Sequence, residues 1–136
     1  MLEKALILAA KAHTGQVDKG GAPYILHPIR VMLACEGEKE KIVALLHDTL
    51  EDTALTAADL RRAGFPEEIV QAVCCLTRGQ KEDYMEYIAR ICENALAARV
   101  KYADLQDNLN IRRIPNPTER DFARIRKYEQ AMKRIT

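Results

Sequence analysis

The chain of 136 residues has no tryptophan, two phenylalanines and a formal net charge of only +1. This near-neutral charge, without any basic-aromatic pattern, argues against a nucleic-acid partner, because such proteins concentrate Lys and Arg on one face. Long apolar runs are also missing: the run that follows Lys4 has six residues, too few for a signal peptide or a membrane span. We therefore expect a cytoplasmic protein with no membrane partner.

Cysteine is scarce and has no metal-binding spacing. The four cysteines, at 35, 74, 75 and 92, form no C-x-x-C pair. Zinc binding by these thiols is therefore not expected. Reduced, mostly buried cysteines are typical of a cytosolic protein.

Strand patterns are missing too, since no run of Val, Ile or Thr alternates with polar residues. Helical spacing extends over nearly the whole chain, and we predict one all-α domain, residues 1–136, with about seven to eight helices. A small hairpin would fit only in the glycine-bearing loop near residues 15–27. The predicted helices are 2–13, 28 to about 37, 39–50, 56–64, 66–77, 83–92, 95–112 and 118–135.

The segment His47-Asp48-Thr49-Leu50-Glu51-Asp52 is the most informative part of the chain. It follows the apolar run 42–46, which indicates a buried helix. On a continuous helix, His47 would lie one turn from Glu51, and Asp48 one turn from Asp52. Carboxylates at this spacing repel one another, and a divalent cation would hold them together. The segment therefore predicts a metal site with spare carboxylates beside it.

Two other segments offer matching ligands. His27 is one of only three histidines, and a further acidic cluster around Asp104 lies far downstream. A histidine, a His-Asp pair and a distant aspartate form a mixed nitrogen and oxygen set. Such a set suits Mn(II), Fe(II), Mg(II) or Zn(II) and leaves positions open for water and substrate.

Four segments in this order resemble a known family. They are AHTGQ at 12–16, PYILHP at 23–28, LLHDTLEDT at 45–53 and VKYADL at 100–105. Together they are similar to the HD-superfamily hydrolase domain of RelA/SpoT-type proteins and of the stand-alone small alarmone hydrolases. The resemblance covers roughly residues 1–112 and implies an HD-type helical bundle.

The resemblance also implies an activity and the residues that perform it. Members of the family are Mn(II)-dependent hydrolases that remove the 3′-pyrophosphate from the guanine alarmones ppGpp and pppGpp. Carried onto this chain, the catalytic pair would be Glu51 and Asp52, and Lys19 and Asn108 would contact the nucleotide. Glu51 would orient or deprotonate the attacking water, and Asp52 would assist it or move the proton to the leaving oxygen. The implied metal ligands are His27, His47, Asp48 and Asp104.

Departures from the family, at Asp18 and downstream at Asn110 and Ile111, keep a second substrate class open. Asp18 stands where the family usually has an arginine that packs on the guanine base, and an acid would repel a polyphosphate. The alternatives are therefore a phosphohydrolase for another small phosphorylated metabolite and a non-catalytic nucleotide-binding regulatory module. The intact Glu51 and Asp52 disfavour the regulatory module.

Every candidate residue also has a purely structural interpretation. His27 could cap a helix, Asp104 could form a salt bridge, and Lys19 or Asn108 could simply face solvent. The chain from Arg112 onward holds eight Lys or Arg against three acids. This basic segment could be a solvated helix face, a contact in a homo-oligomer, or part of a surface that attracts an anionic substrate.

Overall fold

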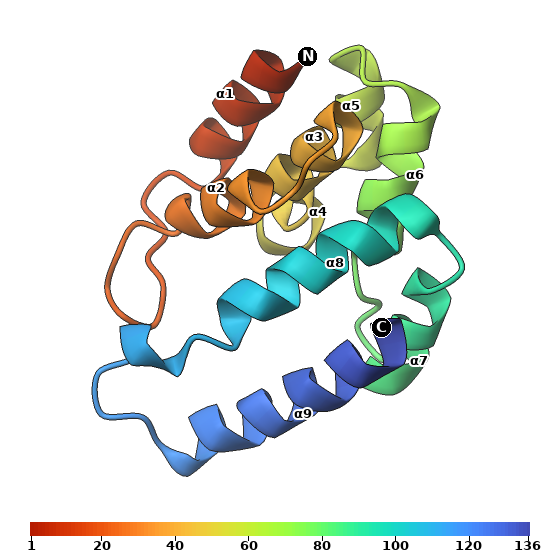
Figure 1. Cartoon of the computed structure of the whole chain (residues 1–136). Coiled ribbons are helices and arrows are strands. Elements are labelled where there is room, and N and C mark those ends of the chain that lie inside the picture. The colour runs from red at the N-terminus through yellow and green to blue at the C-terminus, as the bar shows by residue number, and fades with distance from the viewer.

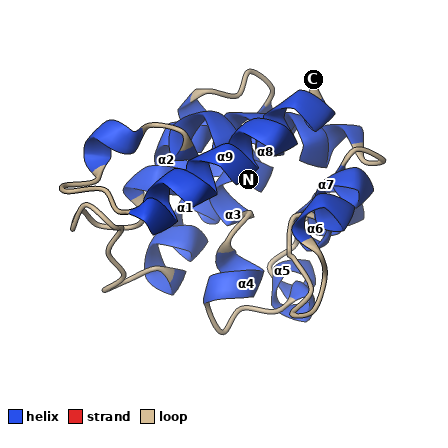
Figure 2. Ribbon diagram, turned by 90° about the horizontal axis from the view of Figure 1, so that it is seen from below, coloured by secondary structure: helices blue, strands red, loops and turns tan.

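The computed structural model describes residues 1–136 and consists of helices and loops, with no strand (Figure 2). The predicted all-α class is therefore confirmed. None of the helices is long and apolar enough to cross a membrane. The elements are α1 (Leu2–Ala12), α2 (Leu26–Leu33), α3 (Glu38–Leu46), α4 (Thr49–Asp52), α5 (Ala57–Arg62), α6 (Glu67–Cys75), α7 (Tyr84–Ile91), α8 (Ala95–Asn108), the 3-10 turn η1 (Ile111–Arg113) and α9 (Glu119–Ile135).

Two helices, α3 and α8, organise the core. The apolar run 42–46 of α3 is buried on all sides, as expected for a helix that is apolar around its circumference. α3 packs against α1, α2, α6 and α8, and α8 also packs against α2, α6, α7 and α9. Figure 1 shows α8 crossing the middle of the molecule between α2 and α9. Side chains on the buried face of α8 therefore lie at the centre of the protein.

That buried face carries charge. Lys101 and Asp104 are buried on α8 among apolar neighbours such as Val100 and Leu105. Taking charges out of water costs several kcal/mol for each ion unless they are paired. A lysine and an aspartate at this depth therefore mark a site for chemistry more than a source of stability.

The helix predicted over 39–50 is interrupted at the His-Asp pair. α3 ends at Leu46, His47 and Asp48 form a turn, and α4 begins at Thr49. Local hydrogen bonds favour this break, because the Thr49 hydroxyl donates to the Leu46 carbonyl oxygen and the His47 imidazole binds the Ala44 carbonyl oxygen. The prediction of one continuous helix through Leu50 was therefore wrong, and the direct stacking of His47 on Glu51 does not follow.

The predicted helix starts are supported by side-chain caps. Thr56 and Asp59 form a capping box at the start of α5, and Asn94 accepts a hydrogen bond from the Ala97 amide at the start of α8. At its other end α8 stops at Asn108, earlier than the predicted 112, and the chain continues into the separate turn η1.

The loop between α1 and α2 contains one isolated bridge, Val17 to Pro23, in place of a hairpin. Asp18 shapes this turn, because its Oδ1 accepts hydrogen bonds from the amides of Gly20 and Ala22, both at 2.9 Å. Gly20 lies directly against the backbone of Arg113, where a Cβ would collide with the carbonyl oxygen. The loop is therefore pressed onto η1 and forms a wall with it.

Candidate functional site

The four predicted metal ligands converge in the structure. Nε2 of His27 on α2 lies 2.8 Å from Oδ1 of Asp104 on α8, although the two residues are 77 positions apart. Nε2 of His47 lies 3.3 Å from the same oxygen and 3.2 Å from Oδ2 of Asp48. Nε2 of His27 and Oδ2 of Asp48 are 3.8 Å apart. We call these four residues the His-Asp cluster.

Both imidazoles present the same nitrogen to this cluster. Nδ1 of His27 lies 2.6 Å from Oδ2 of Asp107, and Nδ1 of His47 faces the Ala44 carbonyl oxygen. An acceptor at Nδ1 makes that nitrogen the donor, so Nε2 of each ring, once it has lost its proton, directs its lone pair at the centre of the cluster. This arrangement is typical of metal-bound histidine.

The donor atoms also fit one ion in their spacing. Ligands bonded at about 2.0–2.2 Å lie roughly 3 Å or slightly more from one another. The four separations between an imidazole Nε2 and a carboxylate oxygen in the His-Asp cluster run from 2.8 to 3.8 Å. His27, His47 and Asp104 are all buried, and their donor atoms lie within 4.8 Å of one another. The protein therefore contains a preformed group of His and Asp donors that suits a divalent cation.

Electrostatics support the same interpretation. Burial by itself lowers the pKa of His47, but the carboxylates of Asp48 and Asp104 outweigh it and raise that pKa well above its ordinary value. Burial likewise opposes ionisation of Asp104, yet Lys101 and His47 keep its pKa well below the usual range. Protons on the imidazoles thus offset the buried carboxylates, and a bound cation would take their place.

The predicted catalytic pair lies beside the His-Asp cluster, next to Asp48. Carboxylate oxygens of Asp48, Glu51 and Asp52 lie within 4.8 Å of one another. Oε1 of Glu51 accepts a hydrogen bond from the backbone amide of Arg78 at 2.8 Å, which fixes this carboxylate. Partial burial and the neighbouring carboxylates of Asp48 and Glu51 raise the pKa of Asp52. A carboxyl with a raised pKa suits proton transfer.

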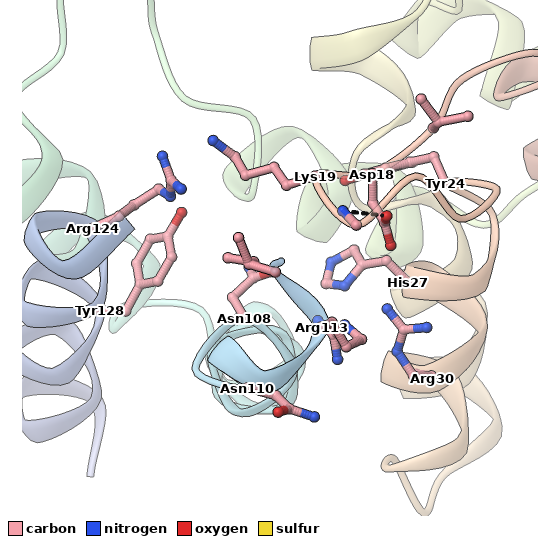
Figure 3. A pocket seen from close by; sticks show the side chains of 13 residues that line it. Asp18, Lys19, Tyr24, His27, Arg30, Asn108, Asn110, Arg113, Arg124 and Tyr128 are labelled. Atoms are coloured by element: carbon pink, nitrogen blue, oxygen red, sulfur yellow. Dashed lines mark hydrogen bonds between the residues drawn. The ribbon is translucent and has the colours of Figure 1, made fainter. Parts of the chain in front are cut away.

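Lys19 and Asn108, the predicted nucleotide contacts, line a cavity of about 370 Å³ next to the His-Asp cluster. Figure 3 shows Lys19 on the loop side, Arg124 and Tyr128 of α9 on the opposite side, and Asn108 between them. Asp18 lines this cavity as well. We call it the first cavity; its cationic side chains are Lys19, Arg30, Arg113 and Arg124.

A second cavity of about 270 Å³ also adjoins the His-Asp cluster, and His27, Asp48 and Asp104 line it. Its lining combines the acids Asp48, Glu51 and Asp52 with the cations Arg78, Lys101 and Lys127. Four residues line both cavities: Tyr24, His27, Asn108 and Tyr128. The two cavities therefore meet at His27 of the His-Asp cluster.

Several residues that contact the predicted ligands were not predicted from the sequence. The Tyr24 hydroxyl donates to Oδ2 of Asp48, and Asp107 binds His27 while accepting hydrogen bonds from Arg30 and Arg113 at 2.8 and 3.0 Å. Tyr24 lies in the PYILHP segment, and Asp107 lies three residues after Asp104. Both were thus close to recognised segments, but their partners depend on how the helices pack.

For the basic C-terminal segment, the structure favours the third alternative, part of a surface that attracts an anionic substrate. Arg124 lines the first cavity and Lys127 the second, so α9 supplies positive charge to both. The signal in the sequence was the excess of Lys and Arg after residue 112. It could not say which of them faces the cavities.

Comparison with known proteins places this site in a family context. No protein-family model matches the chain. It is 30% identical over 144 residues to the GTP pyrophosphokinase of Myxococcus xanthus, a match that covers 92% of this chain and 18% of that protein. It is 32% identical over 120 residues to the guanosine-3′,5′-bis(diphosphate) 3′-pyrophosphohydrolase of Aquifex aeolicus, and 31% identical over 124 residues to the bifunctional (p)ppGpp synthase/hydrolase SpoT of Escherichia coli. Each of these two matches covers 79% of this chain and 17% of the relative.

A solved structure matches nearly the whole chain. A metazoan orthologue of SpoT that hydrolyses ppGpp superimposes with a TM-score of 0.81 at 26% identity, covering 98% of this chain and 84% of that one. The chain is a RelA/SpoT-type, hydrolase-like protein. The predicted resemblance is thereby confirmed, and the helical architecture of this chain agrees with that of the solved relative. The chain spans only 17 to 18% of the length of the three curated relatives described above.

Proposed function

We propose that this protein is an HD-type, metal-dependent phosphohydrolase that removes the 3′-pyrophosphate from guanosine 3′,5′-bis(diphosphate). The proposal is supported by the names of the relatives, by the His-Asp cluster and by the carboxylates beside it. We take Mn(II) as the metal, because two imidazoles and two carboxylates form a mixed nitrogen and oxygen donor set that this ion accepts.

The observation that carries the proposal is that two cavities with cationic side chains share His27 of the His-Asp cluster, while Asp48 and Asp104 line the second of them. Arg113, Arg124 and Lys19 line the first cavity, and Arg78 and Lys127 line the second. Arg and Lys bind phosphate oxygens through charge-assisted hydrogen bonds. A nucleotide with phosphate groups on both its 3′ and 5′ sides could thus place one group in each cavity, with the reacting phosphorus at the junction.

The metal and the protein would divide the chemistry. His27, His47, Asp48 and Asp104 would hold the ion, which supplies Lewis acidity toward a phosphoryl oxygen and toward water. Glu51, fixed by the amide of Arg78, would orient the attacking water and accept its proton. Asp52, next to Glu51, would deliver a proton to the leaving oxygen.

The nucleotide would be held by residues of both cavities. Asn108 is anchored, because its Nδ2 donates to Oδ1 of Asp104 at 3.1 Å. Its amide oxygen is then available to accept a hydrogen bond from sugar or base. Lys19 would bind a phosphate oxygen from the loop, and Tyr128 offers an aromatic face between the two cavities.

Asp18 supports a second candidate, a hydrolase for another small phosphorylated metabolite. Its carboxylate lines the first cavity, where it adds negative charge, even though two backbone amides satisfy one of its oxygens. A smaller or less charged phosphate ester would meet less repulsion there.

A product assay distinguishes these functions. Purified protein is incubated with Mn(II) and a panel of phosphate esters that includes ppGpp, alongside Glu51→Gln and the matched control Glu86→Ala. Glu86 is exposed on α7. We expect pyrophosphate from ppGpp with the wild type and Glu86→Ala, and a loss of about 10² to 10⁴-fold with Glu51→Gln. Turnover of other esters alone would favour the second candidate, and no Mn(II)-dependent turnover would contradict both.

A further inference from the structure

Lys101 is a buried cation that the proposed mechanism does not use. The residue is 8% exposed, and its Nζ lies 2.9 Å from Oδ2 of Asp104, one turn along α8. The ammonium group also lies 5.2 Å from the centre of the Tyr87 ring and 5.9 Å from that of Tyr84. These rings provide favourable cation–π contacts and leave Asp104 as the single carboxylate that Lys101 binds.

The contacts of Asp104 are divided between its two oxygens. Oδ1 faces Nε2 of His27, Nε2 of His47 and Nδ2 of Asn108. Oδ2 is bound by Lys101. Only Oδ1 is therefore aimed at the centre of the His-Asp cluster, and Lys101 would have to release Oδ2 before that oxygen could turn inward.

We propose that Lys101 is a positioning residue that restricts Asp104 to one-oxygen coordination of the metal. A carboxylate that binds through both oxygens occupies two coordination positions, whereas catalytic metal sites keep positions open for water and substrate. Lys101 thus keeps one position free. This inference rests on the proposed metal site but not on the identity of the substrate.

Burial also indicates that Lys101 is not retained for stability. Replacing buried charges by apolar groups of similar volume is often neutral or stabilising, although removing one partner alone leaves the other charge unpaired. A bound divalent cation supplies the missing positive charge next to Asp104. We therefore expect Lys101→Met to remain folded when metal is present, with the methionine packed against Tyr84 and Tyr87.

Co(II) is the probe, because its visible absorption reports coordination number and geometry without any substrate. The wild type, Lys101→Met and Lys101→Arg are titrated with Co(II), and Lys127→Met is the matched control. Lys127 lines the same cavity and contacts Tyr84, but it makes no hydrogen bond or ion pair with Asp104. We expect the absorption bands to shift in position and intensity in Lys101→Met alone, with the wild-type spectrum retained in Lys101→Arg and Lys127→Met.

If Co(II) bound to Lys101→Met gave the wild-type spectrum, the inference about Lys101 would be overturned, but the proposed metal site would stand. Failure of the wild type to bind Co(II) would overturn it together with the metal site, whereas failure to cleave ppGpp would affect only the proposed substrate. Should circular dichroism show Lys101→Met to be unfolded, a crystal structure of the wild type with Co(II) decides the question. Coordination by Oδ1 alone, with Oδ2 on Lys101, supports the inference, and coordination by both oxygens overturns it.

Discussion

The His-Asp cluster and the first cavity are built in different ways. The cluster draws its ligands from α2, α8 and the end of α3, and His27, His47 and Asp104 are each at most 5% exposed. The first cavity is walled by the α1–α2 loop, η1 and α9, and its cations are only half-buried or exposed. A packed core allows little adjustment, whereas surface loops tolerate exchange. This contrast implies that the chemistry is fixed by the core and that substrate preference is set at the periphery.

The strongest test of this contrast is Asp104→Asn. Oδ1 of Asp104 is approached by both His27 and His47, so it is the common point of the cluster. Replacing the carboxylate by an amide removes the charge that a cation needs, while the shape is kept. We expect Mn(II)-dependent hydrolysis to fall to background, measured as pyrophosphate release. Turnover near the wild-type rate would mean that the reaction does not depend on this cluster.

Asp107→Asn tests the layer around the cluster. Asp107 orients His27 through Nδ1 and is itself held by Arg30 and Arg113. Loss of such a carboxylate behind a metal-bound histidine typically costs about 10 to 100-fold in metal affinity or activity. We expect a loss of this size in Mn(II) affinity by calorimetry. An unchanged affinity would show that His27 is oriented by packing alone.

Arg124→Gln tests the first cavity by itself. Arg124 lines the cavity from α9 and makes no hydrogen bond with the His-Asp cluster. Removing one phosphate-binding cation should raise KM about tenfold, or about 1.4 kcal/mol, with little change in kcat. Steady-state kinetics on ppGpp measure this effect, and Arg126→Gln, at an exposed position on the same helix, is the control. If kcat falls as KM rises, the first cavity and the His-Asp cluster do not act independently.

Gly20→Ala should have the smallest effect on catalysis of the four substitutions. The added methyl group would collide with the carbonyl oxygen of Arg113 and push the α1–α2 loop away from η1. Because the clash is with backbone, the loop or η1 has to move, and such overpacking should cost about 1 to 3 kcal/mol of unfolding free energy, measured by urea denaturation. KM should rise while Mn(II) affinity stays constant. A fall in Mn(II) affinity would show that the loop also supports the cluster.

The sequence predicted the helical elements well, because helix caps and apolar spacing are local properties. Thr56 and Asn94 begin helices where expected, and the helix at the C-terminus was placed within one residue at its start. The error at His47 arose where side-chain hydrogen bonds to the backbone competed with the helix. The 15–27 loop, where the sequence left room for a small hairpin, contains a single bridge, because Asp18 and the contact with Arg113 shape that loop.

The site was predictable only in part, because sequence patterns report local properties and not how the helices pack together. His27, His47, Asp48 and Asp104 lie in distinctive segments, and the structure brings them together; their roles, and those of Glu51, Asp52, Lys19 and Asn108, remain predictions. Arg124, Lys127 and Arg78 reach the cavities only through the packing of α9 and the α6–α7 loop, which no local pattern specifies. The charge excess of the C-terminal segment was the one indication of this contribution.

The central claim is that the His-Asp cluster holds the catalytic metal and that Arg124, on the α9 side of the first cavity, does not contribute to metal binding. Calorimetric titration with Mn(II) of the wild type, Asp104→Asn and Arg124→Gln tests it most directly. We predict one ion per chain for the wild type and Arg124→Gln, with equal affinity, and no binding by Asp104→Asn. Wild-type binding by Asp104→Asn would contradict the claim.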